Sequence, residues 1–506
     1  MKSSSPVGVG YIRTPLFASL LLASVLGLEF GVLFFKAGSI PFVHDELLTF
    51  HVSALQPFSR LWTALLAGAD GLPPGYYIMV RFARMLPGDP RLTLRLPSIL
   101  GYILTLLGVY WFAGRRLRPL ASLTATLLIS LSPFREYALL ARSYSLLVGF
   151  LAISAALWQR IDEKRLMTPL LALFLCLAVC CHHLAVVAIL IFGMAELTWS
   201  LLSRRIRWGV WAACLSATGP FLVGLPLILH FREMFGRSFY SRPSWSTAVS
   251  TYGGYWGLDA HFALVLILFF GIAVGDKLSG MLRTPIEKSP KGDFSPPEII
   301  LVGGFLLYPA FLVVLAKLSG GGYGARYGWP AILGLVLGSM YLFRAMWRSY
   351  GHILGALVIA FAIQACNDVI TLAKAGSTRM GERWTALAKV SRGEPDIPVV
   401  IDSMGGYLEA FQYAPPEMHD RLVQVIDESI AMRLDGTDTN VKAQRVRAQF
   451  IPLRVVEVAA FEPAHPRFIL YSSGGHDWFT QYLVEKGYHL TLLSTNGTAS
   501  VYMVQR

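Results

Sequence analysis

Two adjacent acidic residues, Asp45 and Glu46, are the side chains whose type and position point most directly to chemistry. They lie in the segment PFVHDELLTFH at 41–51, just after an apolar run from Pro15 to Phe35. Paired acids at the end of a membrane-spanning segment need water or a substrate beside them. One acid of such a pair can take a proton from an attacking hydroxyl while the other positions it or holds a metal. An ordinary acidic loop beside a membrane is the alternative for this segment taken alone.

The composition places this acid pair in a membrane protein. The chain has 506 residues, of which 54% are hydrophobic and 15% are charged, and its mean hydropathy is +0.53. A soluble domain carries about 25% charged residues. The net charge of +13 comes mostly from short basic clusters between apolar runs, which is typical of cytoplasmic loops, so we expect no nucleic-acid partner. The five cysteines lie in apolar segments without the spacing of a disulfide framework or a zinc site.

The apolar runs predict about eleven membrane-spanning helices, because a hydrocarbon core needs roughly 20 apolar residues per helix. No cleavage site for a signal peptide follows the first run, so we expect it to be retained as a span. The predicted spans are 15–36, 96–113, 119–133, 144–159, 167–181, 184–202, 208–228, 261–281, 298–316, 328–343 and 352–373.

The basic loops predict the orientation, with the N-terminus in the cytoplasm. The acid pair, the loop 134–143, the outer loop 229–260 and the stretch 317–327 then share the outer face. Within the outer loop 37–95, the part 52–95 is broken by prolines, and its apolar runs are too short to cross a membrane. It therefore favours helices lying in the interface.

The composition changes at the end of the predicted transmembrane domain, 1–374. In residues 375–506 charged residues return, and short runs rich in β-branched residues alternate with helical patterns. This alternation predicts a small α/β layer domain, which the orientation places outside the cytoplasm. The fold class is thus a polytopic α-helical membrane protein with a C-terminal extracytoplasmic α/β domain. The strand candidates are 397–403, 421–427 and 467–473, with two more near the end of the chain.

Several short motifs occur in an order that resembles the GT-C superfamily of membrane glycosyltransferases. The branch it resembles contains the protein O-mannosyltransferases and the lipid A aminoarabinose transferases. The resemblance covers roughly residues 15–345. The motifs are Asp45–Glu46, DGLPPGYY at 70–77, RLPSILG at 95–101, ARSYSLL at 141–147, His182–His183 and ARY at 325–327.

The resemblance implies roles for individual residues. Asp45 is the expected general base and Glu46 its partner. Arg142 and Arg326 are expected to hold the departing phosphate, since a guanidinium forks onto phosphate oxygens; snorkelling to lipid headgroups is the alternative for each. Four tyrosines are further candidates for substrate or phosphate binding, although belt or packing roles are common for such residues: Tyr76, Tyr77, Tyr144 and Tyr327.

The chain departs from the family's pattern at the arginine motif. The family usually has an acid before this alanine and arginine, whereas this chain has Leu140. Glu136, one helical turn earlier, is a candidate substitute. A divalent metal ion stays open as a cofactor, with His182, His183 and Glu136 as candidate ligands.

The resemblance implies an enzyme that moves a sugar from a polyprenyl-phosphate donor to an acceptor hydroxyl, with inversion. Membrane lipids and a glycan, lipid or protein acceptor are the expected partners, and the expected location is the inner (plasma) membrane. Transfer of an oligosaccharide or a phospho-group from a lipid carrier is an alternative. A lipid or solute transporter is another, although transporters place charges near the middle of their spans.

The predicted topology can be tested with intact spheroplasts. Protease added from outside should cleave within residues 375–506, because the orientation places them outside the cytoplasm. Cleavage is followed with an antibody against a C-terminal tag, and a cytoplasmic protein serves as the control for lysis. Complete protection of the C-terminal region would contradict the topology.

Overall fold

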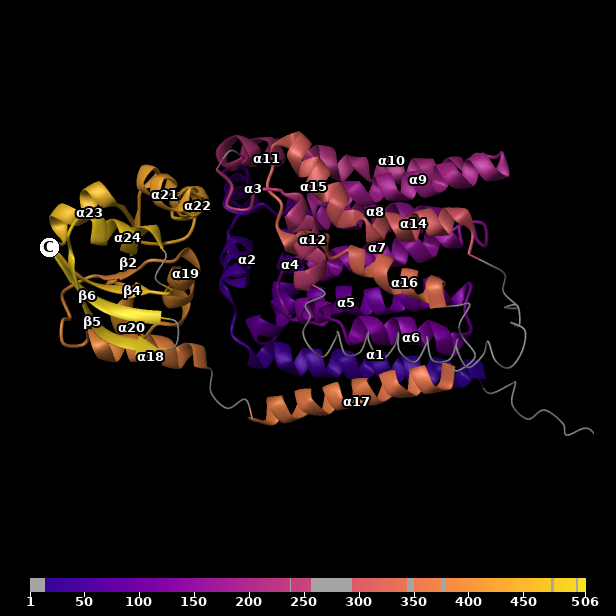
Figure 1. The fold of residues 1–506 in the computed structure, drawn as a ribbon, viewed down its shortest axis with the longest axis horizontal. Coiled ribbons are helices and arrows are strands. Elements are labelled where there is room, and N and C mark those ends of the chain that lie inside the picture. Colours follow the sequence, from indigo (N-terminus) through magenta and orange to yellow (C-terminus); the bar gives the residue numbers. More distant parts are fainter. Residues whose placement is uncertain are drawn as a thin grey trace, which may run out of the picture.

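The computed structural model describes residues 14–236, 238–255, 294–343, 350–374, 379–474, 477–496 and 499–506. The predicted span 261–281 lies outside these residues. The chain forms a helical bundle, which ends with α17, and a C-terminal unit, 379–506, at one end of that bundle (Figure 1).

The described helices of the bundle follow the apolar runs of the sequence. In chain order they are α1 (Thr14–Ser39), α2 (His44–Ala54), α3 (Phe58–Leu66), α4 (Pro74–Arg84), α5 (Pro90–Gly114), α6 (Pro119–Ser130), η1 (Pro133–Leu139), α7 (Tyr144–Gln159), α8 (Met167–Cys181), η2 (His183–Ala185), α9 (Val186–Ser203), α10 (Trp208–Ser216), α11 (Thr218–Phe235), α12 (Trp245–Tyr255), α14 (Pro296–Leu306), α15 (Tyr308–Ser319), η3 (Ala325–Gly328), α16 (Ala331–Phe343) and α17 (Tyr350–Lys374).

Five stretches within the described residues are long and apolar enough to cross a membrane, or seven if two bent helix pairs each count as one span. Three further apolar helices, Pro119–Ser130, Met167–Cys181 and Ala331–Tyr341, are shorter. The total of eleven spans therefore stays a prediction. Between the first two spans, α2, α3 and α4 have only 11, 9 and 11 residues, too short to cross.

Close packing of α5 against α7 fixes the turn that precedes α7. Gly101 on α5 and Gly149 on α7 make this possible, because a Cβ on Gly149 would lie 2.2 Å from the Gly101 carbonyl oxygen. At the start of the same interface, the Ser98 hydroxyl donates to the Arg142 carbonyl oxygen at 3.0 Å. The two glycines thus bring the backbone of Arg142 against α5.

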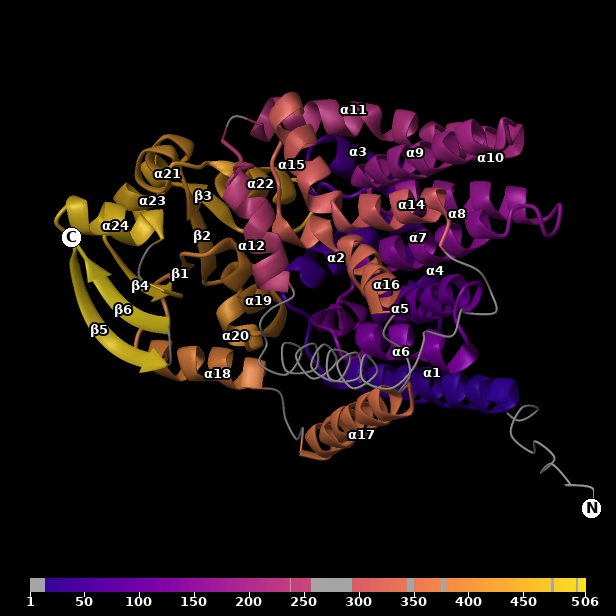
Figure 2. The same ribbon diagram turned by 45° about the vertical axis from the view of Figure 1, so that its right-hand side comes forward.

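Buried ion pairs hold α17 beside α1 (Figures 1 and 2). Asp368 on α17 pairs with Lys36 on α1 at 2.9 Å and with Arg135 on η1 at 2.7 Å. Arg135 also pairs with Glu29, 1% exposed on α1, at 2.7 Å. Because each charge has an opposite partner, the network connects three elements of the bundle without leaving an isolated charge.

The C-terminal unit contains a six-stranded sheet of order β3-β2-β1-β4-β6-β5. The first four strands in this order are parallel, and β6 is antiparallel to β4 and β5. Figure 2 shows β5 and β6 as the yellow edge of the sheet. The strands are β1 (Val399–Ile401), β2 (Leu422–Ile426), β3 (Val455–Glu457), β4 (Arg467–Ser472), β5 (His489–Asn496) and β6 (Ala499–Gln505).

Seven helices accompany the sheet within the described residues of the unit. They are α18 (Arg379–Ser391), α19 (Met404–Tyr413), α20 (Pro416–His419), α21 (Glu428–Asp435), α22 (Thr439–Arg447), α23 (Val458–Ala464) and α24 (Trp478–Glu485).

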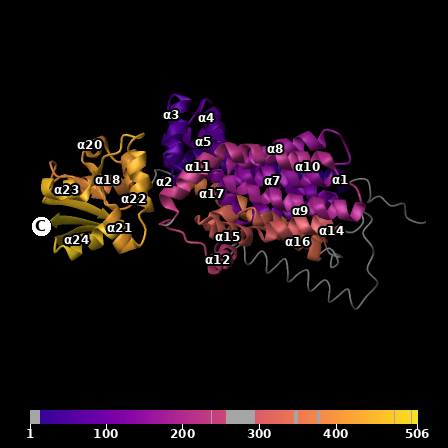
Figure 3. The same ribbon diagram turned by 90° about the horizontal axis from the view of Figure 1, so that it is seen from above.

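Side-chain to backbone hydrogen bonds join the C-terminal unit to the bundle, with α22 and α2 at the junction (Figure 3). The Tyr413 hydroxyl on α19 accepts from the Phe42 amide at 2.7 Å. Thr439 on α22 donates to the Ser238 carbonyl oxygen at 2.9 Å, and Lys442 donates to that of Met234 at 3.2 Å. These bonds fix α22 and α19 over the end of the bundle.

Candidate active site

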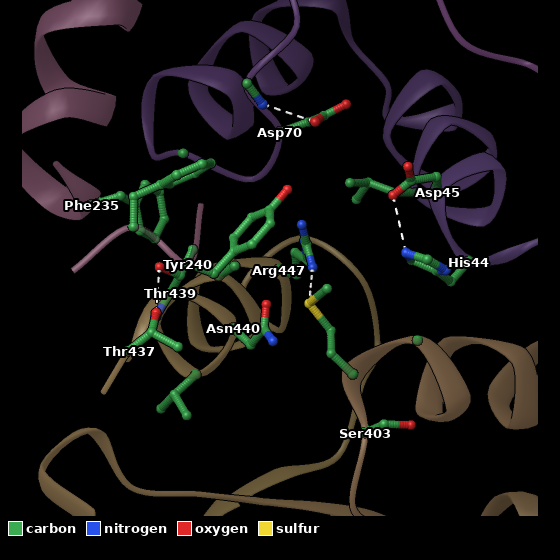
Figure 4. A pocket seen from close by; sticks show the side chains of 18 of the residues that line it. His44, Asp45, Asp70, Phe235, Tyr240, Ser403, Thr437, Thr439, Asn440 and Arg447 are labelled. Atoms are coloured by element: carbon green, nitrogen blue, oxygen red, sulfur yellow. Dashed lines mark hydrogen bonds and ion pairs between the residues drawn. The ribbon is translucent and has the colours of Figure 1, made fainter. Parts of the chain in front are cut away.

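A cavity of about 510 Å³ lies between the end of the bundle and the C-terminal unit. Its volume is within the range of small-molecule sites. Figure 4 shows side chains from both parts facing this space. The bundle contributes charged and aromatic residues, among them His44, Asp45, Asp70, Arg142, Tyr144, His182, Tyr240, Arg326 and Tyr327. The C-terminal unit contributes residues that include Asp402, Ser403, Met404, Gln424, Thr437, Asn440 and Arg447.

Asp45 lies in the first turn of α2 with its carboxylate in the cavity. Its Oδ2 accepts a hydrogen bond from Arg326 Nη1 at 2.5 Å, and its Oδ1 lies 3.1 Å from His44 Nε2. Burial acts to raise the pKa of Asp45, but the hydrogen bond from His44 and the charges of Arg142 and Arg326 outweigh it, so the pKa is lowered. Asp45 is therefore ionised at neutral pH and can accept a proton.

Arg142 lies in the sharp turn between η1 and α7 and is 5% exposed. Its guanidinium forks onto Asp70, with Nη1 to Oδ2 at 2.9 Å and Nη2 to Oδ1 at 3.4 Å. Nη1 also donates to the Asp45 carbonyl oxygen at 3.4 Å and to the Thr49 hydroxyl at 3.3 Å. This fork holds a fixed positive charge beside the Asp45 carboxylate, at a place where little water screens it.

Asp70 is the acid that pairs with Arg142, a role that its sequence pattern did not predict. It precedes α4 in the DGLPPGYY motif, and its Oδ2 also accepts from the Tyr77 hydroxyl at 2.5 Å. Burial acts to raise the pKa of Asp70, but the charge of Arg142 and the hydrogen bond from Tyr77 outweigh it, so the pKa is lowered. Asp70 and Tyr77 lie in one motif, and this spacing is the signal that could have indicated the hydrogen bond between them.

Aromatic rings form the wall beside Arg326. The ring centroids of Tyr144 and Tyr327 lie 6.4 Å apart, and His182 lies 5.8 Å from the first and 5.3 Å from the second. The Tyr240 hydroxyl accepts from Arg326 Nη2 at 3.3 Å. These rings offer apolar faces and hydroxyl groups next to the charged centre, which suits a ligand with both hydroxyl and apolar surfaces.

Glu46 does not line the cavity, in contrast to the expectation that it is a catalytic partner of Asp45. It is 0% exposed, and its carboxylate forms two 2.7 Å hydrogen bonds with Arg95 on α5. It also accepts from the backbone amides of Ala141, at 2.7 Å, and Val43, at 3.1 Å. Glu46 therefore joins α2 to α5 and to the turn that carries Arg142, which is a positioning role.

Four other predicted site residues lie away from the cavity. Tyr76 and Tyr77 are 0% exposed, and Tyr77 contacts the site only by donating a hydrogen bond to Asp70. His183 packs against Gly224 on α11, whereas the adjacent His182 lines the cavity. Glu136 is exposed on η1 and does not replace the missing acid of the arginine motif.

No group of three or more histidine, cysteine, aspartate or glutamate side chains in the described ranges is arranged to hold a metal ion. The candidate ligands His182, His183 and Glu136 have different surroundings, so they do not form one ligand set.

The positioning role of Glu46 predicts that its removal affects folding. Glu46→Ala leaves the 1% exposed Arg95 guanidinium without its carboxylate, and breaking a buried ion pair costs about 3–5 kcal/mol. We expect a clearly lower apparent melting temperature in detergent, with Asp162→Asn, at a 68% exposed side chain, melting close to wild type as the control. A Glu46→Ala variant that melts like wild type would show that this pair does not hold α2.

No model of a known protein family matches the sequence, and no curated protein matches it. Among solved structures, the chain is similar to ArnT from Cupriavidus metallidurans bound to undecaprenyl phosphate, with a TM-score of 0.51 and 13% identity, over 96% of this chain and 98% of that one. The apo state of ArnT gives a TM-score of 0.45 at 13% identity, covering 97% and 98%. An oligosaccharyltransferase of Archaeoglobus fulgidus, tethered with an acceptor peptide, gives 0.40 at 11% identity, covering 97% and 74%.

The similarity to undecaprenyl-phosphate-bound ArnT extends over nearly the whole of both chains, including the bundle and the C-terminal unit. ArnT is a lipid A aminoarabinose transferase and a member of the GT-C superfamily. At 13% identity the likeness concerns the fold. The chain therefore shares the fold of ArnT over nearly its whole length.

Proposed function

We propose that the protein is an integral-membrane glycosyltransferase that moves a sugar from a polyprenyl-phosphate donor to an acceptor hydroxyl, with inversion, on the outer face of the membrane. The observation that carries the proposal is the cavity in which the Asp45 carboxylate bonds Arg326, while the Arg142 guanidinium bonds the Asp45 carbonyl oxygen. A carboxylate that can take a proton and cations that can hold a phosphate are the groups that this reaction requires.

The proposed reaction breaks one bond and forms one. The acceptor oxygen attacks the anomeric carbon of the donor sugar, and the bond from that carbon to the phosphate oxygen breaks. The electrons of this bond leave with the phosphate, and Asp45 takes the proton of the acceptor hydroxyl. Arg142 and Arg326 stabilise the negative charge that grows on the departing phosphate. The leaving group needs no protonating acid, because a phosphate leaves as an anion.

Donor binding also prepares the base in this mechanism. Arg326 bonds Asp45 at 2.5 Å, and its charge is one of the influences that lower the pKa of Asp45. A carboxylate with so low a pKa is a weak base at neutral pH. When the donor phosphate takes over hydrogen bonds from Arg326, the carboxylate loses that partner. Its pKa then rises toward the usual range, so the base becomes stronger once the donor is bound.

Two further features support a lipid-linked donor and an outer-face site. The solved structure with a TM-score of 0.51 contains bound undecaprenyl phosphate, a polyprenyl phosphate. In the sequence, the basic loops favour placing Asp45, Arg142 and Arg326 on the side of the membrane away from the cytoplasm. A donor whose lipid tail lies in the bilayer can then place its phosphate at this end of the bundle.

The test compares wild type with Asp45→Asn in proteoliposomes, using a panel of radiolabelled polyprenyl-phosphate monosaccharides and an envelope extract as the acceptor. Asparagine keeps the shape of the side chain and removes the base. We expect sugar transfer to fall by a factor of about 10² to 10⁴, while the variant stays folded in detergent. Asp162→Asn, at a 68% exposed side chain that pairs with Arg207, is the control and should keep wild-type transfer.

Full transfer by the folded Asp45→Asn variant would show that the base is another group. Wild-type protein that turns over none of the donors would count against a monosaccharide transferase. In that case the alternatives are a transporter and an enzyme that transfers a larger unit or a phospho-group.

A further inference from the structure

Arg447 is a cation of the C-terminal unit that reaches the cavity, and no motif of the sequence points to it. It is the last residue of α22 and is 7% exposed. Figure 4 shows its guanidinium extending from α22 toward the space between Tyr240 and Asp45. It lines the cavity together with residues of the bundle and of the C-terminal unit, and it bonds the Ala69 carbonyl oxygen of the bundle, so Arg447 lies where the two parts of the protein meet.

The hydrogen-bond partners of Arg447 are all uncharged. Its Nε donates to the Ala69 carbonyl oxygen at 3.0 Å, and its Nη1 lies 3.3 Å from Gln444 Oε1 and 2.7 Å from the Met404 sulfur. A thioether sulfur is a weak acceptor. No ion pair to Arg447 occurs within the described ranges. Burial lowers its pKa and outweighs the charges of Asp70 and Asp45, which attract it without contact. A buried cation without a carboxylate in contact is costly, so this site favours the binding of an anion.

The other two arginines of the cavity differ from Arg447 in this respect. Arg142 is paired with Asp70, and Arg326 is paired with Asp45. The three arginines and the two acids that pair with them therefore carry three positive and two negative charges. The positive charge without a paired acid is that of Arg447. A sugar phosphodiester carries one negative charge, and its phosphate gains a second when the sugar leaves. The surplus charge thus matches the ligand before the reaction and stabilises it more strongly afterwards.

Three acids also line the cavity on the side of the C-terminal unit: Asp402, Asp435 and Asp477. Burial raises the pKa of Asp402, and it raises that of Asp477 to about 8, with the nearby Asp402 and Asp435 adding to the effect. Burial likewise raises the pKa of Asp435. Because these shifts favour the protonated forms, the three acids offset the positive charge of Arg447 less than three free carboxylates would.

The helix that carries Arg447 is held firmly against the bundle. Ala443 on α22 packs in an apolar cluster with Phe235 and Phe239. Lys442 on the same helix bonds the Met234 carbonyl oxygen, and Arg447 itself bonds Ala69, next to Asp70. A guanidinium fixed in this way needs little reorganisation to bind a phosphate.

We propose that Arg447 binds the phosphate of the lipid-linked donor together with Arg142 and Arg326, so that the C-terminal unit completes the donor site. This inference rests on the proposed function, because it assumes that a polyprenyl phosphate enters the cavity. The C-terminal unit then contributes directly to catalysis by stabilising the departing phosphate. An acceptor that carries a phosphate is the other source of an anion with the same chemistry, and the experiment separates the two.

The experiment measures binding of undecaprenyl phosphate and of uncharged undecaprenol to the full-length protein in detergent. Arg447→Gln should raise the Kd for undecaprenyl phosphate about tenfold or more, the loss expected for a charge-assisted hydrogen bond. It should leave the Kd for undecaprenol unchanged. Arg445→Gln is the matched control on the same helix, since Arg445 pairs with Glu428 and Glu457 and does not line the cavity. This control should bind both ligands like wild type.

Arg447→Lys distinguishes the role of the charge from a structural role. Lysine keeps the positive charge but lacks the guanidinium group that bonds the Ala69 carbonyl oxygen. If Arg447 binds phosphate, the lysine variant should bind undecaprenyl phosphate more tightly than the glutamine variant does. Equal weakening by both variants, for both ligands and with a lower melting temperature, would show a structural role and overturn the proposal.

An unchanged Kd for undecaprenyl phosphate in Arg447→Gln, with transfer lost only to phosphate-bearing acceptors, would assign Arg447 to the acceptor instead. Wild-type protein that does not bind undecaprenyl phosphate would contradict the proposed function itself.

Discussion

The buried ion pair between Glu46 and Arg95 is the interaction on which the geometry of the site depends. Both side chains are at most 1% exposed, and Arg95 also donates to the carbonyl oxygens of Ala37, Ile40 and Pro41, where α1 leads into α2. Successive side chains of an α-helix point about 100° apart. With Glu46 fixed toward α5, Asp45 is therefore directed to another side of α2, which faces the cavity. The two adjacent acids have different tasks because the helix separates their directions.

The same carboxylate connects α2 to the second half of the site. Glu46 accepts from the Ala141 amide, one residue before Arg142, and the close contact of Gly101 with Gly149 brings that turn against α5. Arg142 in turn forks onto Asp70. One continuous set of buried polar contacts thus holds Asp45, Arg142 and Asp70, which are the proposed base, a phosphate-binding cation and the acid that pairs with that cation. Such preorganised charges can act on a reaction without the cost of reorienting solvent.

The sequence predicted those parts of the site that depend on chain direction and local pattern. Asp45, Arg142, Arg326, Tyr144 and Tyr327 are far apart in the chain, yet all line one cavity, as expected for loops on one face of a membrane. The fold that the resemblance implies is confirmed, because the chain shares the fold of ArnT over 96% of its length. In the C-terminal unit, β1, β2 and β4 overlap the runs from which strands were predicted, whereas β3 was not predicted. Its three residues, Val455–Glu457, are too few to show a pattern.

Other parts of the site depend on tertiary contacts that the sequence does not display. In the sequence, Glu46 cannot be distinguished from its acidic neighbour Asp45, and only its hydrogen bonds with Arg95 in the structure show that its role differs. Asp70 is separated from Arg142 by 72 positions, and Arg447 belongs to a helix whose residues show no motif. α22 lines the cavity only because the C-terminal unit lies over the end of the bundle, with α22 at the junction (Figure 3). For this reason the role of that unit could not be predicted from its composition.

The most direct test of the account is an experimental structure of the full-length protein with bound undecaprenyl phosphate. We expect the phosphate to lie in the cavity in contact with Arg326, Arg142 and Arg447, and the 2.5 Å contact between Arg326 and Asp45 to be lengthened or broken. A phosphate bound outside this cavity, with Arg326 still bonded to Asp45, would contradict it.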